Sequence, residues 1–168
     1  MYLSFDINTK EGDKVLVSLS SSYSYIHDVL PAGIPDFDLV EVSIIRESGS
    51  TPIRMEVFRK IAEILVSIAE DNPASVLFYF CDFADSIPRQ RHKNMPPVVY
   101  RNSLFKLLFA RYKALASEHW SDIEVVLQSD TPKLEMYAHF LLRDRHLPLV
   151  ELLQKEVRDN FEAISGQK

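Results

Sequence analysis

The stretch SVLFYFC, residues 75–81, decides the fold, because every residue after its first serine is apolar or aromatic. Such a short run without a polar face is typical of a strand in the middle of a sheet, covered on both sides. Residues 52–71, which precede it, carry apolar side chains at helical spacing. Thr51 is suited to cap this helix, and Pro52 is suited to its first position. The sequence therefore predicts a helix that leads into a central strand.

Three further strands are expected before this helix. Residues 2–7, 14–20 and 39–47 alternate apolar and polar side chains, which is the pattern of strands with one buried face. A polar connection that contains Gly12 separates the first two, and it favours a hairpin. Residues 20–38 are rich in serine and proline, and their role stays open between a functional lid and a short element of structure.

Two helices and two strands are expected after the central strand. Residues 98–117 and 147–164 carry apolar side chains at helical spacing, whereas residues 122–128 alternate as a strand does. Residues 133–145 fit both a strand and a helix. We favour a strand there, because the turn sequence SDTPK would pair it with residues 122–128 as a hairpin.

The expected order of elements is β-β-β-α-β-α-β-β-α. Runs of strands mixed with isolated helices are typical of α+β proteins, in which helices pack on a sheet. We therefore expect a mostly antiparallel sheet of about six strands with three helices. A chain of 168 residues has the length of one such unit, so we expect a single domain that spans residues 1–168.

The composition narrows the class of protein. The chain has one cysteine, which excludes an internal disulfide, and its first residues do not resemble a signal peptide. No apolar run approaches the ~20 residues that a membrane helix needs. We therefore expect a cytoplasmic protein without membrane contact. The sequence shows no nucleotide-binding or metalloprotease motif, so we expect no cofactor, and it indicates no oligomeric state.

The centre of the chain resembles a known family. An aromatic strand ends in Cys-Asp, a loop with arginines follows, and the next helix carries a Leu-Phe pair and an aromatic end. The positions concerned are Cys81, Asp82, Arg89 or Arg91, Arg101, Leu104, Phe105 and Phe109, within residues 76–112. This pattern resembles an uncharacterised family of small bacterial proteins that is defined only as a domain of unknown function. The resemblance implies a similar layout of strands and terminal helix, and it implies no activity.

Charge is distributed unevenly along the chain. Residues 86–117 contain seven basic side chains and no acidic one, so this block carries +7 and the rest of the chain −12, for a net charge of −5. The candidate binding residues are Arg89, Arg91, Lys93, Arg101 and Lys106. This basic segment, residues 89–113, predicts a module that binds an acidic protein surface or nucleic acid. Alternatively, these cations pair with the acidic remainder of the chain or cover apolar surface.

An alternative interpretation of the same region is a metal-dependent phosphoesterase or nuclease. Asp82 and Asp85 follow the central strand and offer the oxygen ligands that Mg²⁺ prefers. Arg89 or Arg91 would then stabilise phosphate charge. The pattern supplies no third ligand, so we favour a non-enzymatic binding module.

Cysteine and histidine are two further residue types that could have a catalytic or metal-binding role. Cys81 would need a neighbouring cation, or a base such as His92, to act as a nucleophile. A buried thiol at the end of a core strand is the simpler interpretation. The five histidines show no metal-ligand spacing, so we expect them to lie at the surface or to be partly buried.

Overall fold

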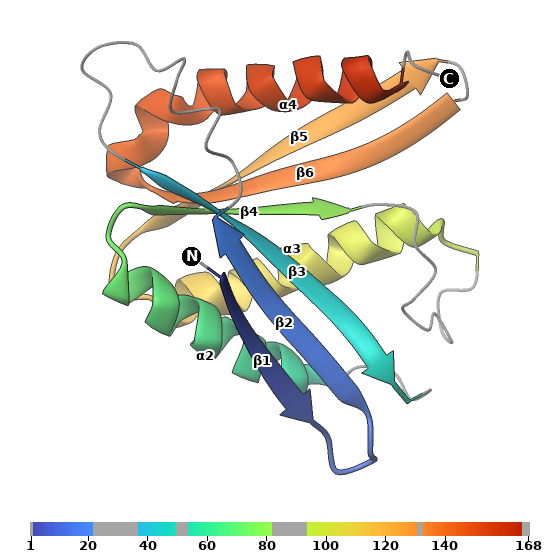
Figure 1. The fold of residues 1–168 in the computed structure, drawn as a ribbon, viewed down its shortest axis with the longest axis vertical. Coiled ribbons are helices and arrows are strands. Elements are labelled where there is room, and N and C mark those ends of the chain that lie inside the picture. Colours follow the sequence, from blue (N-terminus) through green and yellow to red (C-terminus); the bar gives the residue numbers. More distant parts are fainter. Residues whose placement is uncertain (1, 22–36, 50–53, 82–93, 131–132, 166–168) are drawn as a thin grey trace.

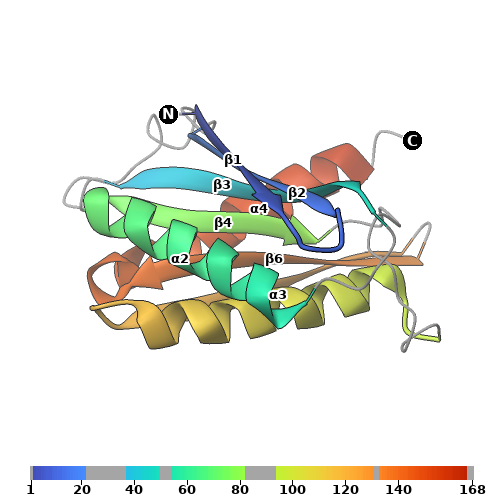
Figure 2. The same ribbon diagram turned by 90° about the horizontal axis from the view of Figure 1, so that it is seen from below.

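The computed structural model describes residues 2–21, 37–49, 54–81, 94–130 and 133–165. In this part of the chain a single six-stranded sheet has the order β1-β2-β3-β4-β6-β5 (Figure 1). The elements are β1 (Tyr2–Asn8), β2 (Lys14–Ser21), β3 (Asp38–Ser48), α2 (Met55–Asp71), β4 (Ser75–Cys81), α3 (Pro97–Leu115), β5 (Trp120–Asp130), β6 (Lys133–Arg143), the 3₁₀ helix η1 (Asp144–Leu149) and α4 (Val150–Ser165). Figure 2 shows α2 and α3 on one face of the sheet and α4 on the other.

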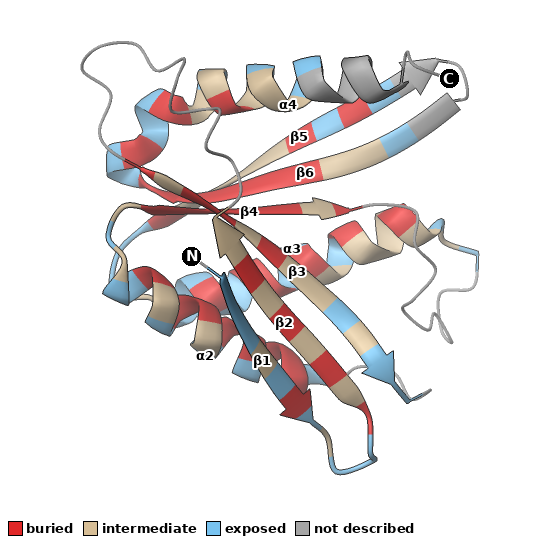
Figure 3. Ribbon diagram, in the orientation of Figure 1, coloured by how far each residue is buried: buried red, intermediate tan, exposed pale blue. Residues whose placement is uncertain are grey.

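Strand β4 lies in the middle of this sheet, as its apolar sequence predicts. Its residues are buried except for Phe80, which is half-buried (Figure 3). Leu77, Tyr79 and Cys81 belong to the core under α2 and α3, whereas Val76 and Phe78 belong to the core under α4. Both faces of β4 are therefore covered, which explains why the strand has no polar side.

The predicted α+β class and the predicted order of elements are confirmed. Residues 133–143 form a strand, β6, which pairs with β5 as the hairpin that the sequence favours. Four of the five pairings between the described strands are antiparallel, and β3 with β4 is parallel. The sheet is therefore mixed, because α2 crosses one face and returns the chain to the end where β3 began.

Helix α2 begins later than its sequence predicts. Arg54 has an extended backbone and precedes the first helical residue, Met55. Thr51 and Pro52 lie outside the described residues, as does most of the 20–38 segment. None of the described helices is long and apolar enough to cross a membrane.

The carboxyl end of α2 is capped from a distant strand. The helix has no basic residue in its last turn. Arg143, on β6, instead donates hydrogen bonds to the carbonyl oxygens of Ala69 and Pro73. Its guanidinium also lies 4.3 Å from the centre of the Trp120 ring and pairs with Glu118 at 2.8 Å. One cation therefore satisfies a carbonyl in the last turn of α2 and the carbonyl of Pro73 in the turn that follows, and it ties β6 to the α2–β4 turn.

Replacement of Arg143 by methionine should lower the free energy of unfolding by about 2–4 kcal/mol, because buried carbonyls lose their donors. Arg145→Met is the matched control. Arg145 also donates to the Pro73 carbonyl, but it is exposed, so its loss should cost less than about 1 kcal/mol. Urea denaturation of the two variants measures the difference. Equal losses would contradict the proposed cap.

The β1–β2 hairpin is attached to the end of β3 by a buried ion pair. Asp13 Oδ1 lies 2.6 Å from Arg46 Nη2, and both side chains are less than a tenth exposed. Gly49 follows β3 with a φ of +99°, and a Cβ on it would lie 1.4 Å from Asp13 Oδ1. The ion pair therefore requires a glycine at position 49.

Gly12 and Gly49 both have a positive φ, but only at Gly49 would a Cβ collide with Asp13. Alanine at each position therefore distinguishes the cost of backbone strain from the cost of this collision. Gly12→Ala should cost about 1–2 kcal/mol, because its φ is +85° but no atom lies within 4 Å of the added methyl group. Gly49→Ala should cost at least about 3 kcal/mol more, because it also displaces Asp13 from Arg46. Chemical denaturation of both variants tests this order, and equal costs would show that Asp13 moves aside freely.

Candidate functional site

Most of the predicted site residues lie outside the described part of the chain. These are Arg89, Arg91, Lys93, Asp82 and Asp85. Two predicted residues, Arg101 and Lys106, lie on α3, where Arg101 is half-buried. The Lys106 ammonium lies 2.6 Å from Glu124 Oε2 on β5. Lys106, one of the predicted binding residues, therefore pairs with an acidic residue of the same chain. The alternative interpretation of the basic segment predicts such a pair.

A polar network surrounds this lysine between α3 and the sheet. Asn102 lies one helical turn before Lys106, and its Nδ2 donates to Glu124 Oε1 at 2.8 Å. The buried ring of His139, on β6, lies 2.7 Å (Nε2) from Asn102 Oδ1 and 2.9 Å (Nδ1) from Asp122 Oδ1. Two strands and one helix therefore meet through five side chains.

The partners of Asn102 assign the orientation of its amide group. A carboxylate only accepts, so Asn102 must turn its amide nitrogen toward Glu124 and its oxygen toward His139. Asp122 Oδ1 lies at the other ring nitrogen. Each ring nitrogen of His139 therefore faces an oxygen atom, and Asn102 links His139 to Glu124.

The Glu124 carboxylate is stabilised in its charged form. Burial by itself would raise the pKa of Glu124, but the hydrogen bonds from Lys106 and Asn102 and the nearby charges of Lys106 and His139 lower it. The result is a pKa below the ordinary value for glutamate. Glu124 therefore stays ionised at neutral pH and keeps the network intact.

Aromatic rings enclose the network on the side of the core. The Tyr79 ring stacks between Phe105, at 4.0 Å and 18°, and His139, at 4.6 Å and 13°. Burial raises the pKa of Tyr79, so its hydroxyl stays neutral. The ring of His139 thus lies against the face of a tyrosine ring, which shields that side of the network from water.

The network is a clamp between α3 and the sheet. His139 is fully buried and both its nitrogens are engaged, so it has no free atom with which to take a proton from a substrate. Within the described residues, no group of three histidine, cysteine or acidic side chains could hold a metal ion. Cys81 is fully buried, as the simpler interpretation predicts, and His92 lies outside the described residues.

The expectation for the histidines was wrong at two positions. His139 and His146 are both buried. His139 is accepted in the core because both nitrogens have partners. His146 stays neutral, because burial and then the charges of Arg145 and Arg143 lower its pKa to about 4. Asn102, Asp122, Glu124 and His139 were not predicted as a group, because the register that places His139 opposite Glu124 is known only from the structure.

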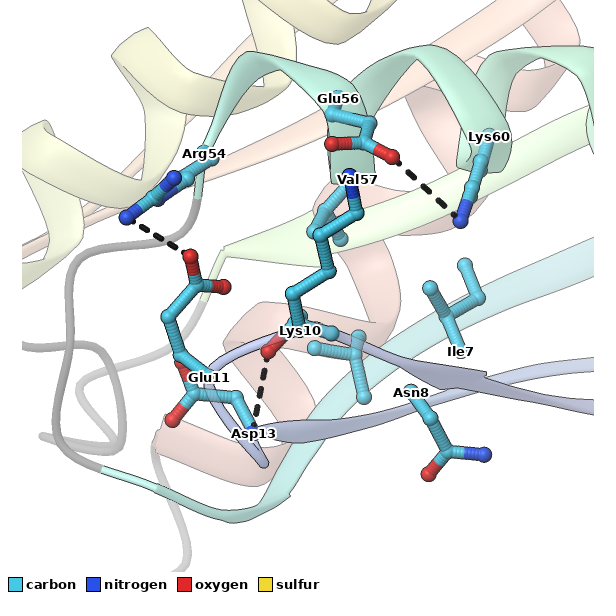
Figure 4. Close-up of a pocket in the computed structure, with 11 residues that line it drawn as sticks. Ile7, Asn8, Lys10, Glu11, Asp13, Arg54, Glu56, Val57 and Lys60 are labelled. Atoms are coloured by element: carbon cyan, nitrogen blue, oxygen red, sulfur yellow. Dashed lines mark hydrogen bonds and ion pairs between the residues drawn. The ribbon is translucent and has the colours of Figure 1, made fainter.

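A small pocket lies where the β1–β2 hairpin meets the first turn of α2 (Figure 4). Its volume is ≈ 140 Å³, and Lys10 reaches across it toward α2. The charges in its wall are largely paired: Arg54 with Glu11 at 2.7 Å, and Lys60 with Glu56 at 3.7 Å. The pocket therefore presents little unbalanced charge to a ligand.

The outer face of α3 is the remaining candidate. Its exposed residues are Ser103, Lys106, Leu107, Ala110, Arg111, Lys113, Ala114 and Leu115. Leu107 and Leu115 are 39% and 44% exposed. No exposed residue of this helix is acidic. The outer face therefore combines exposed leucines and small side chains with three cations, Lys106, Arg111 and Lys113.

Comparison of the chain with protein-family models, with curated proteins and with solved structures gave no match. The resemblance to the bacterial family of unknown function therefore stays a prediction.

The clamp can be tested at Asn102. Asn102→Leu should lower the free energy of unfolding by about 2–4 kcal/mol, because Glu124 and His139 each lose a buried partner. Ser103→Leu, at the next and exposed position, is the matched control and should change stability by less than about 0.5 kcal/mol.

Nitrogen NMR of the His139 ring gives an independent readout. Asn102→Leu removes the partner of Nε2 and leaves Asp122, the partner of Nδ1, in place. The chemical shift of Nε2 should therefore change more than that of Nδ1. Equal changes at the two nitrogens would contradict the assigned partners.

Proposed function

We propose that this protein is a non-enzymatic binding module whose α3 outer face engages a partner protein with an apolar patch bordered by carboxylates. The observation that carries the proposal is the outer face itself, whose exposed residues are apolar, small or basic. This is the described part of the basic segment, residues 89–113, that the sequence singles out.

The outer face has a regular layout. Successive residues of a helix turn by about 100°, so Ser103, Leu107, Ala110 and Ala114 lie in one stripe. Lys106 and Lys113 border the stripe on one side, and Arg111 borders it on the other, as the same turn angle requires. The small side chains of the stripe would let a partner approach closely, while Arg111 and Lys113 meet carboxylates at its edges.

Helix α2, beside α3 on the same face of the sheet, shows what an ordinary solvent-facing side looks like in this protein. Its exposed residues are Met55, Glu56, Arg59, Lys60, Glu63, Ser67, Glu70 and Asp71. Charges of both signs alternate there, and Arg59 pairs with Glu63 at 2.8 Å. The outer face of α3 differs from it in both charge and polarity, which supports a role in binding.

The chemistry of the face favours a protein over nucleic acid or a second copy. A phosphate backbone is matched by cations alone, whereas Leu107 at the centre of the stripe requires an apolar counterpart. Two α3 faces packed on one another would place like charges together. We also propose that the protein is located in the cytoplasm. The metal-dependent alternative stays a prediction, since Asp82 and Asp85 lie outside the described residues.

The probe for this proposal is a labelled amphipathic helical peptide with leucines on one side and glutamates bordering them. Fluorescence anisotropy at two salt concentrations should show binding that weakens as salt increases. Leu107→Asp should weaken it about tenfold or more, because an apolar contact is lost and a like charge appears. Arg111→Ala should weaken it less and reduce the salt dependence. Ser67→Asp on α2 is the matched control and should leave affinity unchanged.

Three further outcomes are informative. A peptide with the same composition in scrambled order should bind more weakly, because its apolar side is lost. Combined replacement of Arg89, Arg91 and Lys93 by alanine tests whether the basic segment contributes beyond α3. No binding of the amphipathic peptide, or a preference for duplex DNA or RNA that is unaffected by Leu107→Asp, would overturn the proposal.

A further inference from the structure

Among the described strands, β1 forms one edge of the sheet, and no other described strand pairs with its outer side. Its partner among the described strands is β2, and the pairing is continuous from Tyr2 to Asn8. Proteins usually protect such an edge with proline, a bulge or several charges. Strand β1 has no proline, its pairing shows no bulge, and Asp6 is its one charged residue.

An open groove runs along this edge, between β1 and α2. Its volume is ≈ 720 Å³. Apolar side chains line it from both elements: Leu3 and Phe5 from the strand, and Ile64 and Ile68 from the helix. Leu3 is 36% exposed, and Phe5, Ile64 and Ile68 are half-buried. The sheet edge and the apolar groove are therefore adjacent.

The charges in the groove indicate its occupant. Three carboxylates, Asp6, Glu63 and Asp71, line the groove with Lys60. Lys14 pairs with Asp6 and Arg59 pairs with Glu63, so the negative charge that a ligand would meet is mainly that of Asp71. Asp71 lies at the carboxyl end of α2, where the helix dipole is also negative and no basic residue lies in the last turn, so this end of the groove favours a basic ligand. It disfavours a second copy of the chain, because β1 carries no basic residue that could meet Asp71.

We propose that β1 and this groove bind an extended basic segment of a partner protein, which adds to the sheet as a seventh strand. The backbone of the segment would pair with the open edge of β1. Every second side chain would enter the groove against Ile64 and Ile68, so these positions are apolar. Lysine or arginine near the end of the segment would meet Asp71, at the carboxyl end of α2. This site is distinct from the α3 outer face.

The test uses the full chain and a short labelled peptide that alternates valine with threonine between two terminal lysines. Fluorescence anisotropy measures affinity, and amide NMR shifts locate the site. We expect shifts along β1 and weaker binding when the lysines are replaced by glutamates. We also expect loss of binding when the peptide amides that would face β1 are methylated, because the backbone hydrogen bonds are then blocked.

Two charge reversals and two apolar replacements localise the effect on the protein. Asp71→Lys should weaken the lysine peptide about fivefold and strengthen the glutamate peptide. Glu151→Lys, on α4 and remote from the groove, makes the same change in net charge and should do neither. Leu3→Asp should abolish binding, whereas Ile45→Asp, at an exposed position of β3 outside the groove, should not.

Three results would overturn the proposal. The first is the absence of peptide binding together with unshifted β1 amides. The second is affinity that Asp71→Lys and Glu151→Lys change equally. The third is dimerisation of the chain that Leu3→Asp abolishes, which would show that a second copy occupies the edge.

Discussion

Strand β4 has no side that water can solvate, and the layers of this protein follow from that constraint. Tyr79 and Leu77 need cover on one face, and Phe78 and Val76 need it on the other. Helices α2 and α3 supply the first layer and α4 supplies the second. Because α2 both precedes β4 and covers it, the chain enters the strand parallel to β3, and a mixed sheet results.

The polar network between α3 and the sheet, which includes Asn102, His139 and Glu124, contributes to the orientation of α3. Helix α3 buries Phe105, Phe109 and Tyr112 on its inner side, whereas its exposed basic residues lie on the outer side. Asn102 is also buried on the inner side, and it is a partner of both His139 and Glu124. We infer that the network adds to apolar burial in setting the rotation of α3, at a cost in desolvation.

The fold was more predictable from the sequence than the candidate site was. Apolar periodicity reports which face of an element is buried, so the central strand, the hairpin of β5 with β6 and the three helices could be expected. The network depends instead on which residues lie opposite one another, and periodicity does not give the register to one residue. His139 could be placed beside Glu124 only once the hairpin register was known. The loop residues Asp82, Asp85, Arg89 and Arg91 have no apolar pattern to constrain them, and they lie outside the described residues.

The pairing of β4 with β6 has a consequence for synthesis. Residues 77–81 find their antiparallel partners in residues 137–141, which the ribosome makes much later. Until then, β1, β2, β3, α2 and β4 can form a sheet that ends in an unpaired and strongly apolar strand. Such an edge is a site of association between nascent chains. The interval between the translation of β4 and that of β6 is therefore when this protein most needs protection from aggregation.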